Sequence, residues 1–174
     1  MKEIEMERVF LIRKLPNKLK ECRKITIRVG DFFEPNKVDA LKIKQIGDNF
    51  FLVKKEGKST YNRVEHSIRI KKREFEILWK ATMQKHKKIR YFYPIGEKIC
   101  EIDFYQDRLK GYARLEVEFK TDKEMKEFKV PAWFGKEITK LNHKIHKNLG
   151  TVTFKEMKKR YSDKGIALNK IIYN

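Results

Sequence analysis

The chain has 174 residues, which suits a single domain, and a hydrophobic fraction of 40% that permits a packed core and excludes full disorder. Its formal net charge of +19 indicates either a solvated basic surface or a polyanionic partner, such as nucleic acid, an anionic membrane surface or a polyphosphate compound. No apolar run approaches the ~20 residues of a membrane-spanning helix. With no secretory leader pattern and only two cysteines, we expect a cytoplasmic protein without a disulfide framework.

Most of the first 120 residues are predicted to form strands, because β-branched and aromatic residues recur there at period two. The predicted strands cover residues 3–12, 25–29, 38–46, 49–55, 67–78, 87–94, 98–105 and 111–120. Turn residues separate them at positions 34–36, 47–49, 56–58, 94–96 and 106–108. Many closely spaced strands favour a closed antiparallel sheet, which exposes no edge.

Helices are predicted between the strands and in the C-terminal part. They begin, in chain order, at Pro16, Thr121, Ile138 and Thr153. Thr121 and Thr153 are each followed three residues later by a glutamate, which is a capping-box pattern. With no repeat or linker, we expect one α+β domain over residues 1–174, in which residues 151–174 form a basic helical tail.

Charged residues recur at period two inside the predicted strands, so within each strand they share one face. These sets are Glu5 and Glu7, Lys42 and Lys44, Lys72, Glu74 and Glu76, Lys88 and Arg90, Glu101 and Asp103, and Arg114, Glu116 and Glu118. In any one strand the simplest interpretation is a charged face in water. Six strands with the same pattern favour a barrel whose charged face lines the lumen, while the apolar face packs against helices.

A lumen lined by both signs of charge requires counter-ions, because unpaired buried charge costs several kcal/mol. Divalent cations would satisfy the carboxylates, and phosphates would satisfy the lysines and arginines. Mg²⁺ prefers carboxylate oxygens and is commonly held together with substrate phosphates. The pattern therefore favours a site for a metal ion and a phosphate compound.

In order along residues 3–150, the chain resembles the CYTH family, the triphosphate tunnel metalloenzymes. The segment Glu5-Met6-Glu7-Arg8-Val9, followed by Leu15-Pro16, is similar to the family's N-terminal Glu-x-Glu-x-Lys signature. The further matching segments are 42–44, 51–55, 72–76, 88–91, 103–104, 109–112, 116–119 and 131–139. Each motif alone is weak, and their shared order is specific.

The resemblance implies a closed antiparallel β-barrel, or tunnel, of about eight strands flanked by helices. It implies hydrolysis of inorganic tripolyphosphate or a nucleoside triphosphate with Mg²⁺ or Mn²⁺. By the same resemblance, the metal site would draw on Glu5, Glu7, Glu74, Glu76, Asp103, Glu116 and Glu118. The phosphate chain would be bound by Lys42, Lys44, Lys55, Lys72, Lys88, Arg90 and, by strand parity alone, Arg114. Glu7, Glu118 and Lys88 would be the catalytic residues.

Three positions depart from the family pattern, and they place catalysis in question. Val9 replaces the signature lysine, and its side chain offers neither charge nor hydrogen bond. Lys42 and Lys44 replace an arginine pair, although lysine cannot form the bidentate fork of arginine. Val53 replaces the usual threonine. A weak or inactive protein that binds polyphosphate or a triphosphate is therefore an alternative, as are adenylate cyclase and thiamine triphosphatase.

Two other features have simpler interpretations. Basic residues at 155–160 and 85–88 raise the possibility of a nucleic-acid partner, but no nucleic-acid motif accompanies them, which favours solvated surfaces. His143 and His146 lie three apart and could ligate zinc, but without further ligands nearby a surface or capping role is the better interpretation. The sequence leaves monomer and homodimer both open.

Overall fold

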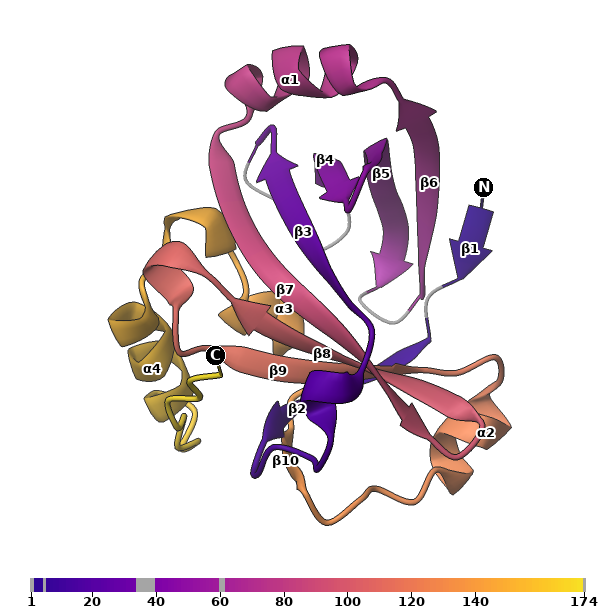
Figure 1. The fold of residues 1–174 in the computed structure, drawn as a ribbon, viewed down its shortest axis with the longest axis vertical. Coiled ribbons are helices and arrows are strands. Elements are labelled where there is room, and N and C mark those ends of the chain that lie inside the picture. The colour runs from indigo at the N-terminus through magenta and orange to yellow at the C-terminus, as the bar shows by residue number, and fades with distance from the viewer. Residues whose placement is uncertain (1, 5, 34–39, 60–61, 174) are drawn as a thin grey trace.

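The computed structural model describes residues 2–4, 6–33, 40–59 and 62–173. Within them, an antiparallel sheet of ten strands bends around the molecule in the order β1-β6-β5-β4-β3-β7-β8-β9-β2-β10 (Figure 1). Helices lie on both sides of the sheet, which confirms the α+β class. No helix within these residues is long and apolar enough to cross a membrane.

The strands span β1 Lys2–Ile4, β2 Glu7–Ile12, β3 Lys24–Asp31, β4 Ala40–Ile46, β5 Asn49–Ser59, β6 Asn62–Ile70, β7 Gln84–Ile95, β8 Lys98–Tyr105, β9 Ala113–Glu118 and β10 Phe134–Glu137. The α-helices are α1 Lys72–Ala81, α2 Asp122–Glu127, α3 Asn142–Ile145 and α4 Phe154–Ser162. Three short 3-10 helices are η1 Leu19–Glu21, η2 Asp107–Leu109 and η3 Leu149–Thr151.

The two N-terminal strands pair at opposite parts of the sheet. Strand β1 pairs with β6, whereas β2, which follows it almost immediately, pairs with β9. One stretch of chain thus reaches both halves of the bent sheet. Among the described residues no ladder joins β1 to β2 or to β10, so the sheet has ten strands in an open order, where about eight in a closed barrel were expected.

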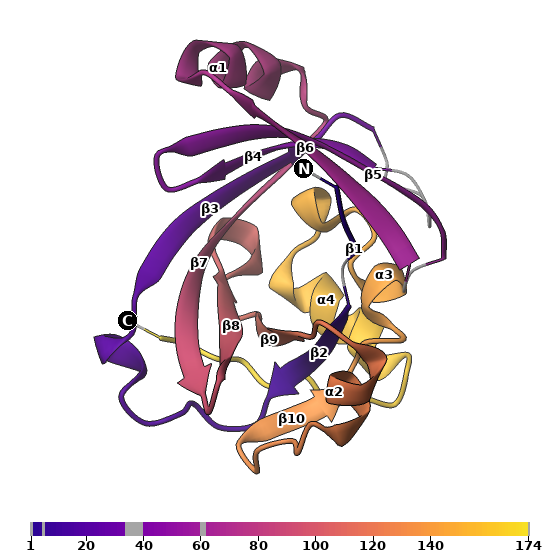
Figure 2. The same cartoon turned by 90° about the vertical axis from the view of Figure 1, so that its right-hand side faces the viewer.

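The apolar face of the sheet points outward, as the strand pattern predicts. Ile102, Leu115 and Val117 are fully buried on that face under Phe134 and other residues of the 119–134 region. At the other end of the sheet, α1 covers Ile43, with Phe75 of the helix at 0% exposure (Figure 2). Fully burying one such side chain contributes roughly 1.5–3 kcal/mol, so this layer holds the charged face inward.

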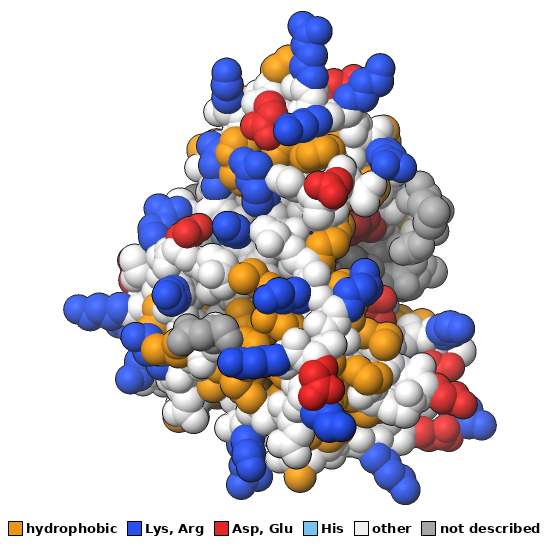
Figure 3. Space-filling model, in the orientation of Figure 1, with side chains coloured by type: hydrophobic (Ala, Val, Ile, Leu, Met, Phe, Trp, Pro, Cys, Tyr) orange, Lys and Arg blue, Asp and Glu red, His pale blue; other side chains and the backbone are white. Residues whose placement is uncertain are grey.

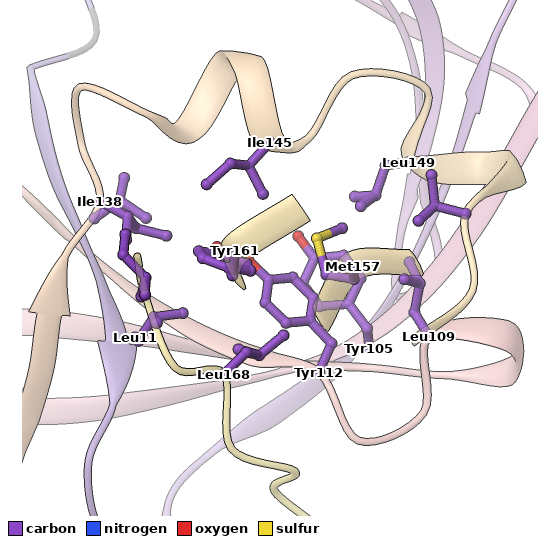
Figure 4. Close-up of a cluster of buried hydrophobic side chains, with 13 residues drawn as sticks. Leu11, Tyr105, Leu109, Tyr112, Ile138, Ile145, Leu149, Met157, Tyr161 and Leu168 are labelled. Atoms are coloured by element: carbon purple, nitrogen blue, oxygen red, sulfur yellow. Dashed lines mark hydrogen bonds between the residues drawn. The ribbon is translucent and has the colours of Figure 1, made fainter. Parts of the chain in front are cut away.

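A third cluster fills part of the opposite, inner face. Val9 and Leu11 of β2 pack there against the segment from Ile138 to Leu168, which includes α3, η3 and α4. Tyr112 and Met157 lie at the centre of this cluster, and both are fully buried (Figure 4). The C-terminal segment therefore covers one part of the inner face and leaves the rest to form a cavity.

Several local predictions are confirmed. The side chain of Thr121 accepts a hydrogen bond from the backbone N–H of Glu124 at the start of α2, and Thr153 forms a complete capping box with Glu156 at the start of α4. The short N-terminal helix is reduced to η1, and the predicted helix from Ile138 is mostly irregular, with only α3 and η3 helical.

One strand prediction and one turn prediction are wrong. The strand predicted over residues 67–78 ends at Ile70, and α1 begins two residues later. The turn predicted at residues 56–58 lies inside β5, which continues to Ser59. Strand β10 was not predicted.

Candidate active site

The inner face of the sheet surrounds a cavity of about 390 Å³ that is lined mainly by ionised side chains. Its walls come from β2 to β9 and from the segment around α3 and η3. The charged lining residues are Glu7, Asp31, Lys42, Lys44, Lys55, Glu65, Lys88, Arg90, Arg114, Glu116, Glu118 and Lys147. His86 and His146, Tyr105 and Asn142 also contribute. Strand alternation explains the charge, because most apolar residues of the strands point to the outer clusters, with Val9, Leu11 and Val29 among the exceptions on the inner face.

One wall is a buried ion-pair network centred on Asp103, which is 0% exposed. Arg90 donates two hydrogen bonds to its carboxylate, from Nε to Oδ1 at 2.7 Å and from Nη2 to Oδ2 at 2.8 Å. Lys88 Nζ also donates to Oδ2. Arg90 Nη2 reaches Glu116 at 2.8 Å, and Arg114 pairs with the same glutamate. The network joins β7, β8 and β9 across the cavity floor.

The charges in this wall set the pKa values of its members. Burial raises the pKa of Asp103, but Lys88 and Arg90 outweigh it and hold that pKa below its usual range. Burial and the neighbouring Arg90 lower the pKa of Lys88, and Asp103 opposes them. Asp103 is therefore ionised, and Lys88 is a more acidic ammonium than a lysine in water.

The facing wall carries three lysines that are each paired with a carboxylate. Lys42 Nζ lies 3.3 Å from Asp31, and Glu65 contacts Lys44 at 3.2 Å and Lys55 at 2.7 Å. Burial opposes ionisation of Glu65, but the two lysines outweigh it and lower the pKa of Glu65 to about 2. The lysines are thus held in place by internal counter-ions.

Glu7 and Glu118 are directly opposite each other on β2 and β9, and both line the cavity. Glu116 lies on the same face, but its carboxylate is bound by Arg90 and Arg114. The carboxylates of Glu7 and Glu118 fit the divalent cation of the family, since Mg²⁺ is usually held by one or two carboxylates together with substrate phosphates. The described part of the chain contains no group of three or more acidic, histidine or cysteine ligands, and Glu5 lies outside it.

His146 links the cavity to the C-terminal cluster through both of its ring nitrogens. Nδ1 is 3.2 Å from Arg114 Nη1, and Nε2 contacts the hydroxyl of Tyr112, which lies 2.9 Å from the hydroxyl of Tyr161. Because a guanidinium can only donate, Nδ1 must accept, and Nε2 carries the hydrogen. Burial and Arg114 lower the pKa of His146 well below its usual value, so the ring is neutral. His146 is the C-cap residue of α3, which agrees with the capping role expected for it, but its side chain lies at the cavity and not at the surface.

The structure brings most of the predicted site residues together. The members at the cavity are Glu7, Lys42, Lys44, Lys55, Lys88, Arg90, Arg114, Glu116 and Glu118, with Asp103 directly behind them. Lys72, Glu74 and Glu76 are not among the cavity-lining residues, because they lie on α1, on the outer side of the sheet. The interpretation of these three as lumen residues is therefore wrong, since it depended on the incorrect strand over 67–78.

Sequence reasoning missed other lining residues. Asp31 and His86 lie just beyond the predicted ends of their strands, and Glu65 falls in a polar stretch that gave no strand signal. His86 lies two residues before Lys88, so extending the predicted strand toward the N-terminus would have placed it on the same face. No sequence signal places His146 or Asn142 at the cavity, because they come from an irregular segment.

Val9 occupies the signature lysine position without contributing to the cavity lining. Its side chain is 0% exposed and packs in the inner apolar cluster. In the β2–β9 ladder it is directly opposite Glu116. The side chain of Val9 is therefore enclosed by apolar side chains, and Glu116 is its neighbour on the adjacent strand.

Comparison with known proteins identifies this fold. An inorganic triphosphatase of Nitrosomonas europaea is 30% identical over 168 residues, which cover 95% of this chain and 97% of that protein. The crystal structure of an inorganic triphosphatase is 29% identical with a TM-score of 0.63, covering 85% of this chain and 95% of that one. An adenylate cyclase candidate from Bacillus halodurans shares the fold, at 15% identity and a TM-score of 0.50, over 99% of this chain and 95% of the other. No family model matches the chain.

An antiparallel sheet with an ionised interior and an apolar exterior defines the structural class. With near-complete coverage of a relative at 30% identity, the chain belongs to the CYTH family, the triphosphate tunnel metalloenzymes.

Replacing Asp103 by asparagine should strongly destabilise the protein. The change leaves Lys88 and Arg90 buried without their main counter-ion, which typically costs about 3–5 kcal/mol. Urea unfolding followed by circular dichroism measures the free energy of unfolding. The matched control is Glu124→Gln, whose partly exposed pair with Lys98 is screened by solvent and should contribute far less to stability. Equal losses in the two variants would contradict the central role of Asp103.

Stability should also fall as the pH drops from 7 to 5. Burial and nearby cations lower the pKa of His86 to about 3, and His146 is lowered in the same direction. The unfolded chain takes up protons below about pH 6.5 while the folded protein does not, so folding stability is lost as the pH falls. The expected loss is about 2 kcal/mol per histidine, measured by urea unfolding at both pH values. A flat profile would contradict it, and His146→Gln should remove about half of the slope.

Proposed function

We propose that this protein hydrolyses a triphosphate, with inorganic tripolyphosphate as the first candidate, in the charged cavity and with Mg²⁺ or Mn²⁺. The observation that supports this most is the convergence of lysines and arginines from β4, β5, β7 and β9 on one cavity that also presents Glu7 and Glu118. The name and the near-complete coverage of the Nitrosomonas europaea relative support the same substrate. We further propose that strands β1 and β2, which pair with β6 and β9, complete the tunnel wall.

To bind the phosphate chain, the lysines of the cavity would exchange their carboxylate partners for phosphate oxygens. Lys42, Lys44 and Lys55 are held by Asp31 and Glu65, so their ammonium groups are already ordered at the wall. A triphosphate carries more negative charge than these carboxylates and can replace them as the lysines' partner. Binding therefore costs little further conformational entropy of the lysine side chains, which favours affinity.

Phosphoryl transfer depends mainly on holding the reacting groups in line and neutralising charge. Glu7 and Glu118 would hold the divalent cation, which supplies further neutralisation of the phosphoryl oxygens when bound. A glutamate oxygen left over from this role would accept a hydrogen bond from the attacking water and orient it. Arg90 remains fixed by Asp103 and presents a rigid cation to the substrate.

Lys88 is suited to assist the leaving phosphate. It lines the cavity beside Arg90, and burial lowers its pKa. An ammonium that is more acidic than usual donates a stronger hydrogen bond, or its proton, to the oxygen on which charge develops. We assign this role to Nζ of Lys88.

A second candidate function is supported by Val9. Val9 places a buried apolar side chain where the family pattern has a lysine, so the site lacks that amine. Loss of one stabilising donor typically costs about 10²–10³ in rate. The protein would then bind a triphosphate and turn it over slowly or not at all.

A nucleic-acid partner receives less support. On the face shown in Figure 3, lysines and arginines are scattered and interspersed with acidic and hydrophobic side chains. Nucleic-acid surfaces instead present a continuous basic stripe or patch.

Glu118→Gln should abolish most phosphate release from tripolyphosphate with Mg²⁺ or Mn²⁺, because it removes one of the two carboxylates that face each other at the cavity. We expect a loss of about 10²-fold or more in kcat, measured by colorimetric detection of phosphate. The control is Glu127→Gln on the exposed side of α2. Unchanged turnover in Glu118→Gln would contradict the proposed site.

Val9→Lys separates the two candidate functions. If the missing amine limits catalysis, the new lysine opposite Glu116 should raise kcat by about 10²–10³-fold. Val9→Met keeps an apolar side chain of similar length and serves as the control. A wild-type protein that already turns over rapidly, with no gain in Val9→Lys, would exclude the weak-enzyme alternative.

A further inference from the structure

His86 lines the cavity from β7, on the same face as Lys88 and Arg90. Its Nδ1 is sealed from solvent and has no hydrogen-bond partner among the residues that the structure describes. The second histidine at the cavity, His146, has both ring nitrogens engaged by the protein. Within the described part of the chain, Nδ1 of His86 is therefore not engaged as the ring nitrogens of His146 are, and the ring stands at the cavity where a ligand would bind.

Charged groups face His86 from several elements. Three cations act on it, Lys88 on the same strand, Lys42 on β4 and Arg114 on β9, and Asp103 on β8 opposes them. The ring of Tyr105 lies 6.0 Å away between centroids, and the neutral His146 is also nearby. Burial first, and then the three cations, lower the pKa of His86 to about 3. The ring is consequently uncharged at physiological pH.

A neutral imidazole carries one N–H and one lone pair. Buried N–H groups without a partner are rarer than acceptors without one. The sealed Nδ1 therefore carries the lone pair, and Nε2 carries the hydrogen. Because His86 contributes to the cavity wall, Nε2 is the ring nitrogen that a ligand can reach.

We propose that His86 is a substrate-binding residue whose Nε2–H donates an uncharged hydrogen bond to a phosphoryl oxygen of the triphosphate. This inference rests on the proposed function and deepens it. Lysine ammonium groups attract an anion from many directions, whereas an imidazole N–H has one fixed direction. With Lys88 and Lys42 nearby, His86 would orient one phosphoryl group among cations that only neutralise it.

Calorimetric binding of sodium tripolyphosphate without divalent cation tests the inference, since no turnover then interferes. His86→Leu removes the donor and should weaken binding by about tenfold or more. His86→Gln keeps a donor near the position of Nε2 and should restore affinity close to wild type. The matched control is His66→Leu, at a histidine on β6 that is paired with Glu56 outside the cavity.

Nitrogen-15 NMR of the imidazole ring gives a second readout on the wild-type protein. We expect a neutral ring, protonated on Nε2, both before and after tripolyphosphate is added, with a change in the Nε2 signal on binding. This measurement decides the question even if His86→Leu fails to fold.

Several outcomes would overturn the inference: a ring that becomes charged on binding, an unchanged Nε2 signal at saturation, or a glutamine variant as weak as the leucine variant. If the wild type binds and hydrolyses tripolyphosphate and His86→Leu binds equally well, only the role of His86 fails. If the wild type does not bind tripolyphosphate, the proposed function fails, and the role of His86 fails with it.

Discussion

The carboxylate of Asp103 is the constraint on which the cavity depends. It lies fully buried between Lys88 and Arg90, and through Arg90 and Glu116 it is connected to Arg114. Without it, Lys88 would lose its carboxylate partner in a poorly solvated interior, and Arg90 would be left to Glu101 and Glu116. Ion pairs of this kind rarely add net stability over a hydrophobic core. Their value here is positional, because they keep arginine and lysine groups at fixed places in a cavity.

The two walls of the cavity differ in how their charged side chains are neutralised. Around Asp103, cations and carboxylates form multiple hydrogen bonds and are almost sealed from solvent. Across the cavity, Lys44 and Lys55 share one carboxylate, Glu65, and the side chain of Lys44 is 22% exposed, compared with 9% for Lys88. The first wall is therefore rigid, whereas the second can exchange its counter-ions for those of a ligand. A cavity built from one fixed and one exchangeable wall suits a substrate whose charge must be bound and released in each cycle.

Much of the cavity could be predicted from the sequence, because strand alternation determines which side chains share a face. Lys88 with Arg90, and Glu116 with Glu118, follow directly from that rule. The same rule fails at 72–76, where Phe75, Leu78 and Trp79 also fit a helical face, and α1 forms because those three pack onto β4 and β5. Glu65 and His146 depend on long-range packing that local pattern does not encode.

The first dozen residues carry a consequence for how the molecule is made. Glu7 meets Glu118 in register, and β1 meets β6, so each pairing joins positions that are far apart along the chain. During synthesis, β2 must wait until β9 has left the ribosome, and such distant pairings are intrinsically slow to form. The carboxylate pair at the cavity is consequently among the last features to be assembled, so an incompletely synthesised chain lacks it.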